Sequence, residues 1–80
     1  MRHIYLIRRI SHPDQHYIGL TGNLDKRLKK HNEGGSPHSS KYKPWELVAY
    51  LSFSSPIRAA AFEKYLKSGS GRAFARKRLW

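Results

Sequence analysis

An arginine and a histidine occupy helix positions that normally face a hydrophobic core. Residues 24–33 predict a helix, closed by a pair of glycines, and the spacing i, i+3, i+4, i+7 places on one face Leu24, Arg27, Leu28 and His31. The guanidinium of Arg27 suits the charge of a phosphate group. Each residue alone also has an ordinary interpretation. An arginine can lay its stem along the core with its head in water, and a protonated histidine near a helix end is favoured by the helix dipole.

A glutamate stands in the apolar face of a second expected helix. This helix runs from Pro56 to about Lys67, with Ser55 as N-cap, and its inward positions are Ala59, Phe62, Glu63 and Leu66. Because burying an unpaired carboxylate is costly, Glu63 should have a cationic or metal partner. A single carboxylate suits Mg²⁺, which keeps several waters and completes its shell with substrate phosphate oxygens. An ion pair with Arg27 or another basic residue is the alternative.

Two tyrosines stand in strand-like segments near the N-terminus. Residues 2–9 and 16–20 predict an antiparallel hairpin, which would place Tyr5 roughly opposite Tyr17. In a plain hairpin both rings would simply pack. If instead the tyrosines, the arginine, the histidine and the glutamate meet over one sheet face, the set suits phosphodiester hydrolysis. The histidines His12, His16 and His38 match no zinc motif and are interpreted as surface residues.

The remaining elements complete a single α+β domain over residues 1–80. A strand is expected over 45–53, and a short basic helix over 72–79 follows the stretch 68–71, which is expected to close the preceding helix. The order ββαβαα implies a three-stranded antiparallel sheet flanked by helices, because three strands are stable only when helices cover them.

The charge of the chain predicts a polyanionic partner. Sixteen Lys and Arg against five Asp and Glu give a net charge of +11. Nucleic acid is the first candidate, and an anionic membrane surface is disfavoured because no segment pairs a strong apolar face with a basic one. The residues expected to contact nucleic acid are Lys26, Lys30, Lys41, Lys43, Arg72 and Arg76.

The absence of certain residues and segments excludes other classes. With no cysteine in the sequence, disulfide scaffolds, thiolate zinc sites and a cysteine nucleophile are excluded. No apolar run approaches the ~18 residues of a membrane span, and the N-terminus shows no signal-peptide pattern. A cytoplasmic location is therefore expected.

The chain resembles the GIY-YIG nuclease superfamily, and in particular small stand-alone proteins that consist of this domain alone. His3-Ile4-Tyr5 stands where GIY is expected, with histidine in place of the first glycine, and Tyr17-Ile18-Gly19 is an intact YIG. The likeness continues over essentially the whole chain, through Thr21, Leu24, Arg27-Leu28, His31-Asn32, Pro44-Trp45-Glu46-Leu47-Val48 and the segment from Glu63 to Arg72.

The resemblance implies a nuclease that uses one divalent metal ion, Mg²⁺ or Mn²⁺. By this likeness Tyr5 is the general base, Tyr17 assists through its hydroxyl, Arg27 stabilises the scissile phosphate, His31 orients the nucleophile or phosphate, and Glu63 binds the metal. The expected activity is a structure-selective DNA endonuclease. A non-catalytic nucleic-acid-binding module on the same fold is the alternative, and divalent-metal-dependent cleavage separates the two.

Overall fold

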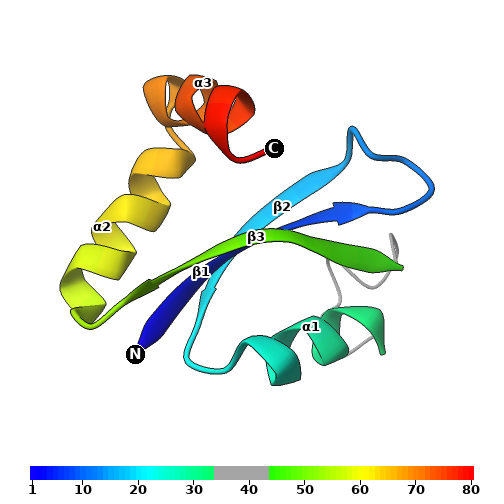
Figure 1. The fold of residues 1–80 in the computed structure, drawn as a ribbon, viewed down its shortest axis with the longest axis horizontal. Helices are drawn as coiled ribbons and strands as arrows, with labels where there is room; N and C mark the ends of the chain where they lie inside the picture. The colour runs from blue at the N-terminus through cyan, green and yellow to red at the C-terminus, as the bar shows by residue number, and fades with distance from the viewer. Residues whose placement is uncertain (34–43) are drawn as a thin grey trace.

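The computed structural model describes residues 1–33 and 44–80 and shows a sheet with helices on both faces (Figure 1). In chain order the elements are β1 (Arg2–Arg9), β2 (His16–Thr21), α1 (Leu24–Asn32), β3 (Trp45–Phe53), α2 (Pro56–Leu66) and α3 (Gly69–Arg78). The predicted α+β class and the order ββαβαα are confirmed. Among the described residues, no helix has the length and apolar character needed to cross a membrane.

The sheet has the order β2-β1-β3, with both pairs antiparallel. Tyr5 lies opposite Gly19 and Ile7 lies opposite Tyr17, so the expected pairing of Tyr5 with Tyr17 is wrong by two residues. The register is set at the hairpin, where the Arg9 amide donates to the Gln15 carbonyl at 3.0 Å. Because side chains alternate faces with a period of two, this shift leaves both tyrosines on the same face.

The central strand β1 separates two small hydrophobic cores. On the α1 side, Tyr5, Ile7 and Trp45 are buried together, with Leu24 and Leu28 of α1 packed against them. On the other side the buried residues are Ile4, Leu6, Leu66 and Ala75, joined by partly buried side chains of β2, β3 and α2, and by Leu79 and Trp80 after α3. Both faces of β1 are covered, which explains why its sequence is apolar at successive positions.

Helix α1 is fixed at both ends by asparagines. The Asn23 side chain caps the N-terminus by accepting from the Lys26 amide at 3.0 Å. At the other end, the Asn32 amide group donates to the Trp45 carbonyl at 3.1 Å and accepts from the Trp45 amide at 2.7 Å. These bonds attach the end of α1 to the start of β3. Of residues 34–44, which connect α1 to β3, the structure describes only Pro44.

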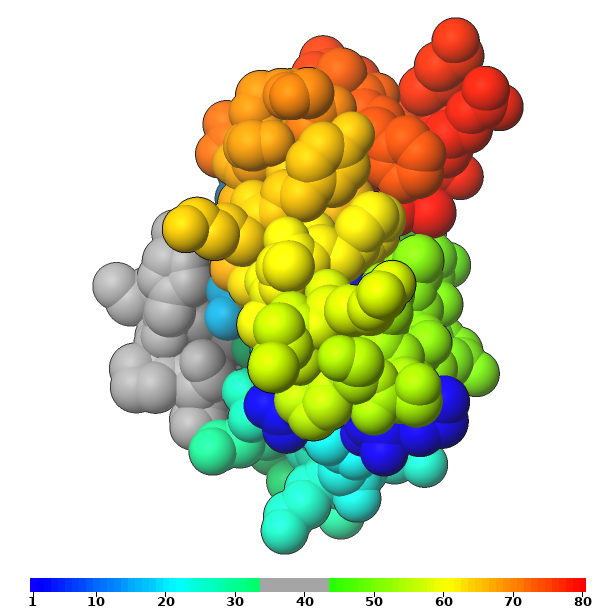
Figure 2. Space-filling view, turned by 90° about the vertical axis from the view of Figure 1, so that its left-hand side faces the viewer, coloured from blue at the N-terminus to red at the C-terminus, as the bar shows by residue number. Residues whose placement is uncertain are grey.

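Helices α2 and α3 together cover the opposite face of the sheet, and Figure 2 shows α3 seated against one end of α2. Ser55 and Pro56 begin α2 as expected. Helix α3 begins at Gly69, three residues earlier than predicted, because the Ser68 side chain caps it by accepting from the Gly71 amide at 3.2 Å. Residues 68–71 therefore begin α3 as well as following the end of α2. Gly71 is buried, and a Cβ there would overlap the Tyr65 carbonyl and lie 2.7 Å from the Leu66 Cα.

Candidate active site

Tyr5 lies at the centre of an aromatic cluster on the α1 side of the sheet. Its side chain is 2 % exposed, and its hydroxyl is hydrogen-bonded to Nε2 of His31 at 2.9 Å. The ring of Tyr17 lies 6.2 Å from the Tyr5 ring and 5.0 Å from the His31 ring, measured between centroids. Trp45 closes the cluster, with its ring 6.3 Å from that of Tyr17. The structure thus brings three of the predicted site residues, Tyr5, Tyr17 and His31, into direct contact.

Gly19 makes room for the Tyr5 side chain. The two residues are cross-strand partners, and a Cβ on Gly19 would overlap the Tyr5 hydroxyl and lie 2.7 Å from Cε1 of its ring. A glycine inside a strand often marks such a close approach. The glycine of the YIG segment is therefore needed because the phenol of the other strand lies across it. Sequence reasoning missed this role, although a glycine in the middle of a strand was a visible signal.

The protonation of Tyr5 depends on burial and on two neighbours. Burial, and after it the nearby Tyr17, raise the pKa of Tyr5 to about 12, while the positive charge and hydrogen bonding of Arg27 act in the opposite direction. The Tyr5 phenol is therefore protonated at neutral pH in the protein without ligands. Arg27 was expected on the face turned to the sheet, but its side chain is mostly exposed. Its exposed guanidinium still acts on the Tyr5 hydroxyl.

His31 is held as a neutral imidazole. His31 is 1 % exposed, and this burial lowers the pKa of its imidazole below the usual 6.5. The positive charges of Arg27 and Lys30 lower the pKa further. In the tautomer that carries its proton on Nδ1, Nε2 is free to accept a hydrogen bond from the Tyr5 hydroxyl. The favourable interaction of a protonated histidine with the helix dipole therefore does not explain this residue. Its ring instead lies among those of Tyr5, Tyr17 and Trp45.

Glu63 lies on the other side of the sheet from this cluster, since α2 packs on the face opposite α1 (Figure 1). The expectation that all five groups meet over one sheet face is therefore wrong. The alternative, an ion pair with Arg27 or another basic residue, is confirmed in its second form, because the Glu63 carboxylate pairs with Lys67 one turn later, at 2.6 Å. The Glu63 side chain is 20 % exposed, so the carboxylate is accessible at the edge of α2.

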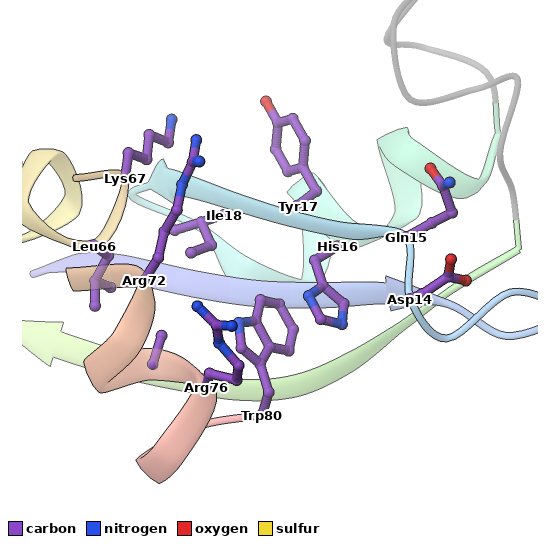
Figure 3. Close-up of a pocket in the computed structure, with 11 residues that line it drawn as sticks. Asp14, Gln15, His16, Tyr17, Ile18, Leu66, Lys67, Arg72, Arg76 and Trp80 are labelled. Atoms are coloured by element: carbon purple, nitrogen blue, oxygen red, sulfur yellow. The ribbon is translucent and has the colours of Figure 1, made fainter. Parts of the chain in front are cut away.

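An open groove of about 710 Å³ connects the two sides at the edge strand β2. Its lining includes Tyr17 from β2, Lys67 after α2, and Arg72 and Arg76 from α3. Figure 3 shows the side chains of Tyr17, Lys67 and Arg72 pointing toward the same side of the strand. Two of the lining residues contact proposed site residues, since Lys67 is bonded to Glu63 and Tyr17 contacts His31.

The residues around Glu63 fit a weakly held divalent ion. Within residues 1–33 and 44–80, no group of three or more histidine, cysteine or acidic side chains is placed to hold a metal. A closed protein cage is therefore not formed by the described residues. A single accessible carboxylate beside a cationic groove instead fits an ion such as Mg²⁺, which retains water and uses phosphate oxygens of a substrate as further ligands. Lys67 supplies the positive charge at Glu63 in the protein alone.

The residues expected to contact nucleic acid are distributed over two helices. Lys26 and Lys30 are exposed on α1, while Arg72 and Arg76 are exposed on α3 and line the groove. Lys41 and Lys43 lie outside the described residues.

Another part of the groove was not foreseen. His16, interpreted from the sequence as an isolated surface residue, is exposed but stacks on Trp80, with ring centroids 3.9 Å apart and an angle of 12° between the planes. No spacing in the sequence relates these two positions, because the contact depends on how α3 returns the chain end to β2.

The fold and these groups define a small basic domain of a kind suited to the chemistry of phosphodiesters. The chain belongs to the GIY-YIG family, since the sequence model described as the GIY-YIG catalytic domain matches residues 1–77. The chain is also similar to curated proteins that are named as subunits of endonucleases.

The similar region is a small part of each of these relatives. The "structure-specific endonuclease subunit SLX1" of Debaryomyces hansenii is 35% identical over 71 residues, which covers 80% of this chain and 20% of the relative. The protein of the same name from Eremothecium gossypii is 41% identical over 66 residues, covering 74% and 22%. The homolog from Giardia intestinalis is 38% identical over 55 residues, covering 64% and 15%. The chain thus spans about a fifth of the length of the curated relatives it matches.

Proposed function

We propose that this domain is a divalent-metal-dependent endonuclease that hydrolyses phosphodiester bonds in DNA. The observation that carries the proposal is the Tyr5 hydroxyl, bonded to a neutral His31 and influenced by Arg27. Its neighbour Tyr17 lines a groove that is also lined by Lys67, the ion-pair partner of Glu63. Family membership supports it, since GIY-YIG nucleases generally depend on a divalent metal.

In the proposed reaction, Arg27 binds the scissile phosphate and stabilises the negative charge that develops on its oxygens. Its exposed guanidinium is accessible to a substrate and already acts on the Tyr5 hydroxyl, so phosphate and phenol would meet at one point. Groups positioned in advance for the developing charge contribute much of the rate in such reactions. Tyr17 contacts the rings of Tyr5 and His31 and lines the groove, and in this proposal its hydroxyl would orient the attacking water.

Tyr5 is the proposed general base, and its protonation is the main barrier to that role. With a pKa of about 12, roughly one phenol in 10⁵ is ionised at pH 7. His31 can take the hydroxyl proton of Tyr5 at Nε2 while the phenol oxygen takes a proton from the attacking water, so this step would leave Tyr5 neutral and His31 protonated. The positive charge of Arg27 lowers the cost of a phenolate.

Glu63 would hold the divalent ion, with Lys67 moving aside from the carboxylate. When bound, the ion supplies positive charge beside the phosphate and stabilises the anionic forms of neighbouring hydroxyl groups. The cost of displacing Lys67 is small, because Lys67 is half-exposed and an ion pair between residues four apart on a helix contributes about 0.3–0.5 kcal/mol. Mg²⁺ or Mn²⁺ fits a site built on a single carboxylate.

Branched, damaged or single-stranded DNA is the proposed substrate class. The name of the SLX1 relatives includes the words structure-specific. The cationic side chains described above would bind phosphates without regard to sequence. The single domain over residues 1–80 and the cytoplasmic location stay predictions.

A non-catalytic nucleic-acid-binding module is the second candidate. Two observations favour it: the Tyr5 phenol is protonated at neutral pH, and Glu63 already has a cationic partner in Lys67. Binding alone needs neither a base nor a metal.

A cleavage assay separates the two candidates. Single-stranded, duplex, flap and branched DNA are incubated with the wild type and with Tyr5→Phe, in Mg²⁺ or in EDTA. The nuclease cleaves at least one substrate only in Mg²⁺, and Tyr5→Phe reduces the rate by about 10²–10⁴-fold while it still folds and binds. Cleavage of none of these substrates in Mg²⁺, with binding intact, would favour the binding module.

A further inference from the structure

The groove extends beyond the residues that the proposed reaction uses. Its volume of about 710 Å³ lies in the range of roughly 300–1,000 Å³ typical of ligand sites. Tyr17 and Lys67 adjoin the proposed reaction centre, whereas His16, Trp80 and Arg76 line a part of the groove that the hydrolysis itself does not require. Aromatic and basic side chains thus line this second part of the groove, and such side chains can bind a ligand without taking part in the hydrolysis.

The stacked pair of His16 and Trp80 forms a platform with one anchored ring and one open ring. Trp80 packs against the core, and its amide donates to the Ala75 carbonyl at 2.9 Å. His16 stacks on it with centroids 3.9 Å apart and planes 12° from parallel. His16 is exposed, and Trp80 is its one ring contact among the described residues, so the imidazole is accessible to a flat ligand.

Two arginines of α3 accompany this platform. Arg72 and Arg76 stand four residues apart, so they lie on one face of the helix, and both line the groove. Neither side chain forms an ion pair or a hydrogen bond within residues 1–33 and 44–80. Figure 3 shows Arg76 next to the Trp80 ring, and Arg72 pointing toward the side where Tyr17 lies. Asp14 is the one acidic side chain among the described residues that line the groove, so the basic side chains of Lys67, Arg72 and Arg76 outnumber it.

An aromatic platform between free guanidinium groups matches the chemistry of a nucleotide. Rings of this kind stack bases regardless of sequence, and arginines bind the phosphates on either side. A base inside a duplex has both faces covered by its neighbours and cannot stack on His16. An unpaired base has a free face.

We propose that the part of the groove between β2 and α3 binds an unpaired nucleobase of the DNA substrate, stacked on His16 and Trp80, with the adjoining phosphates held by Arg72 and Arg76. This inference rests on the proposed function and specifies its substrate. A DNA strand bound with its scissile phosphate near Tyr5 would continue past Tyr17 along the groove. Its next unpaired base would then reach the platform of His16 and Trp80. The domain would thereby select DNA in which paired and unpaired segments meet.

The test measures binding in EDTA, where no cleavage occurs. The probes are a fluorescent DNA hairpin with a short unpaired tail, a series in which one tail base at a time is replaced by an abasic residue, and the blunt hairpin. The abasic probes keep every phosphate and remove one stacking surface. The variants are His16→Ala, His16→Phe, and His12→Ala as a matched control, since His12 is an exposed hairpin histidine outside the groove.

The wild type should lose affinity by roughly 5- to 150-fold when one particular tail base is removed, which is the effect of losing one base–aromatic stack. His16→Ala should bind the intact tail more weakly by a similar factor and should not respond to the abasic series. His16→Phe should restore both the affinity and the response, and His12→Ala should behave as the wild type. Equal binding of tailed and blunt hairpins, or a His16→Ala variant that still responds to the abasic position, would overturn the inference.

The same probes in Mg²⁺ separate this inference from the proposed function. Cleavage of the tailed hairpin by a protein that ignores every abasic position would leave the nuclease assignment standing and overturn the platform. A response to one abasic position, abolished in His16→Ala, without cleavage of any substrate would support the platform and overturn the nuclease assignment.

Discussion

Replacing Gly19 by alanine should displace the proposed general base without removing it. The new Cβ would overlap the Tyr5 hydroxyl and lie 2.7 Å from Cε1, whereas ordinary contacts begin near 3.4 Å. The ring must therefore move by at least about 0.7 Å at Cε1 and by more at the hydroxyl. Since Tyr5 is 2 % exposed and surrounded by aromatic rings, this movement disturbs its hydrogen bond to His31.

The size of the effect follows from this geometry. Forcing an extra carbon into a packed core costs about 1–3 kcal/mol. For a domain of this length, such a cost lowers the melting temperature by roughly 5–20 °C. A misplacement of about 1 Å at a reacting group reduces the rate by about 10²-fold. Gly19→Ala should therefore lose both stability and cleavage, although no proposed catalytic side chain has changed.

Thermal denaturation and single-turnover cleavage measure the two losses. Gly69→Ala is the matched control, because a Cβ at Gly69 meets nothing within 4 Å and alanine is a better helix former than glycine. Combining Gly19→Ala with Tyr5→Leu should restore part of the stability, because the shorter side chain removes the overlap. A Gly19→Ala protein with the melting temperature and cleavage rate of the wild type would refute this account of the YIG glycine.

Three further predictions concern charge. Because the pKa of His31 is lowered by folding, its contribution to stability is present above pH 6.5 and is lost as the pH falls below that value. The melting temperature of His31→Gln should therefore fall less between pH 7.5 and 5.5 than that of the wild type. An equal fall would contradict the neutral state of His31 in the folded protein. Lys67→Gln should raise the affinity of Glu63 for Mn²⁺ by about twofold in calorimetric titration, since the lysine that competes with the cation for the carboxylate is removed. Weaker binding would argue against a cation site at Glu63. Arg72→Gln should reduce the slope of log affinity for DNA against log salt by about 0.7–0.9, the value for one phosphate contact, and an unchanged slope would place Arg72 outside the interface.

Much of the fold was predictable because local signals agreed with the tertiary structure. The strand over 2–9 is apolar at successive positions because it is covered on both faces, and Ser55-Pro56 gives an unambiguous helix start. The start of α3 was missed because Gly69 and Gly71 usually end helices. Here Gly71 is required by its close contact with the backbone of α2, which no local pattern reveals.

The candidate site was predictable in its residues but not in its arrangement. Helical periodicity identified Arg27, His31 and Glu63 as unusual, because a polar group in an apolar stripe needs an explanation. Periodicity says nothing about which face of the sheet each helix covers, so the placement of Glu63 opposite His31 had to come from the structure. The contact between His16 and Trp80 joins residues far apart in sequence and leaves no periodic signal.

The role of Glu63 is the central claim, and one variant tests it most directly. Glu63→Gln keeps the shape of the side chain and removes the charge that would bind the metal. Its partner Lys67 is half-exposed, so the lost ion pair is worth about 0.3–0.5 kcal/mol and the melting temperature should change by only a few degrees. Glu33→Gln is the matched control, because Glu33 forms a similar but more exposed pair with Lys29.

The measurement is the rate of cleavage of a tailed or branched DNA in Mg²⁺ by the wild type and these two variants, together with binding in EDTA. The account predicts that Glu63→Gln loses cleavage while it folds and binds DNA as well as the wild type or slightly better, since a negative charge has left a basic groove. Glu33→Gln should cleave normally. Mg²⁺-dependent cleavage by Glu63→Gln at the wild-type rate would contradict the account.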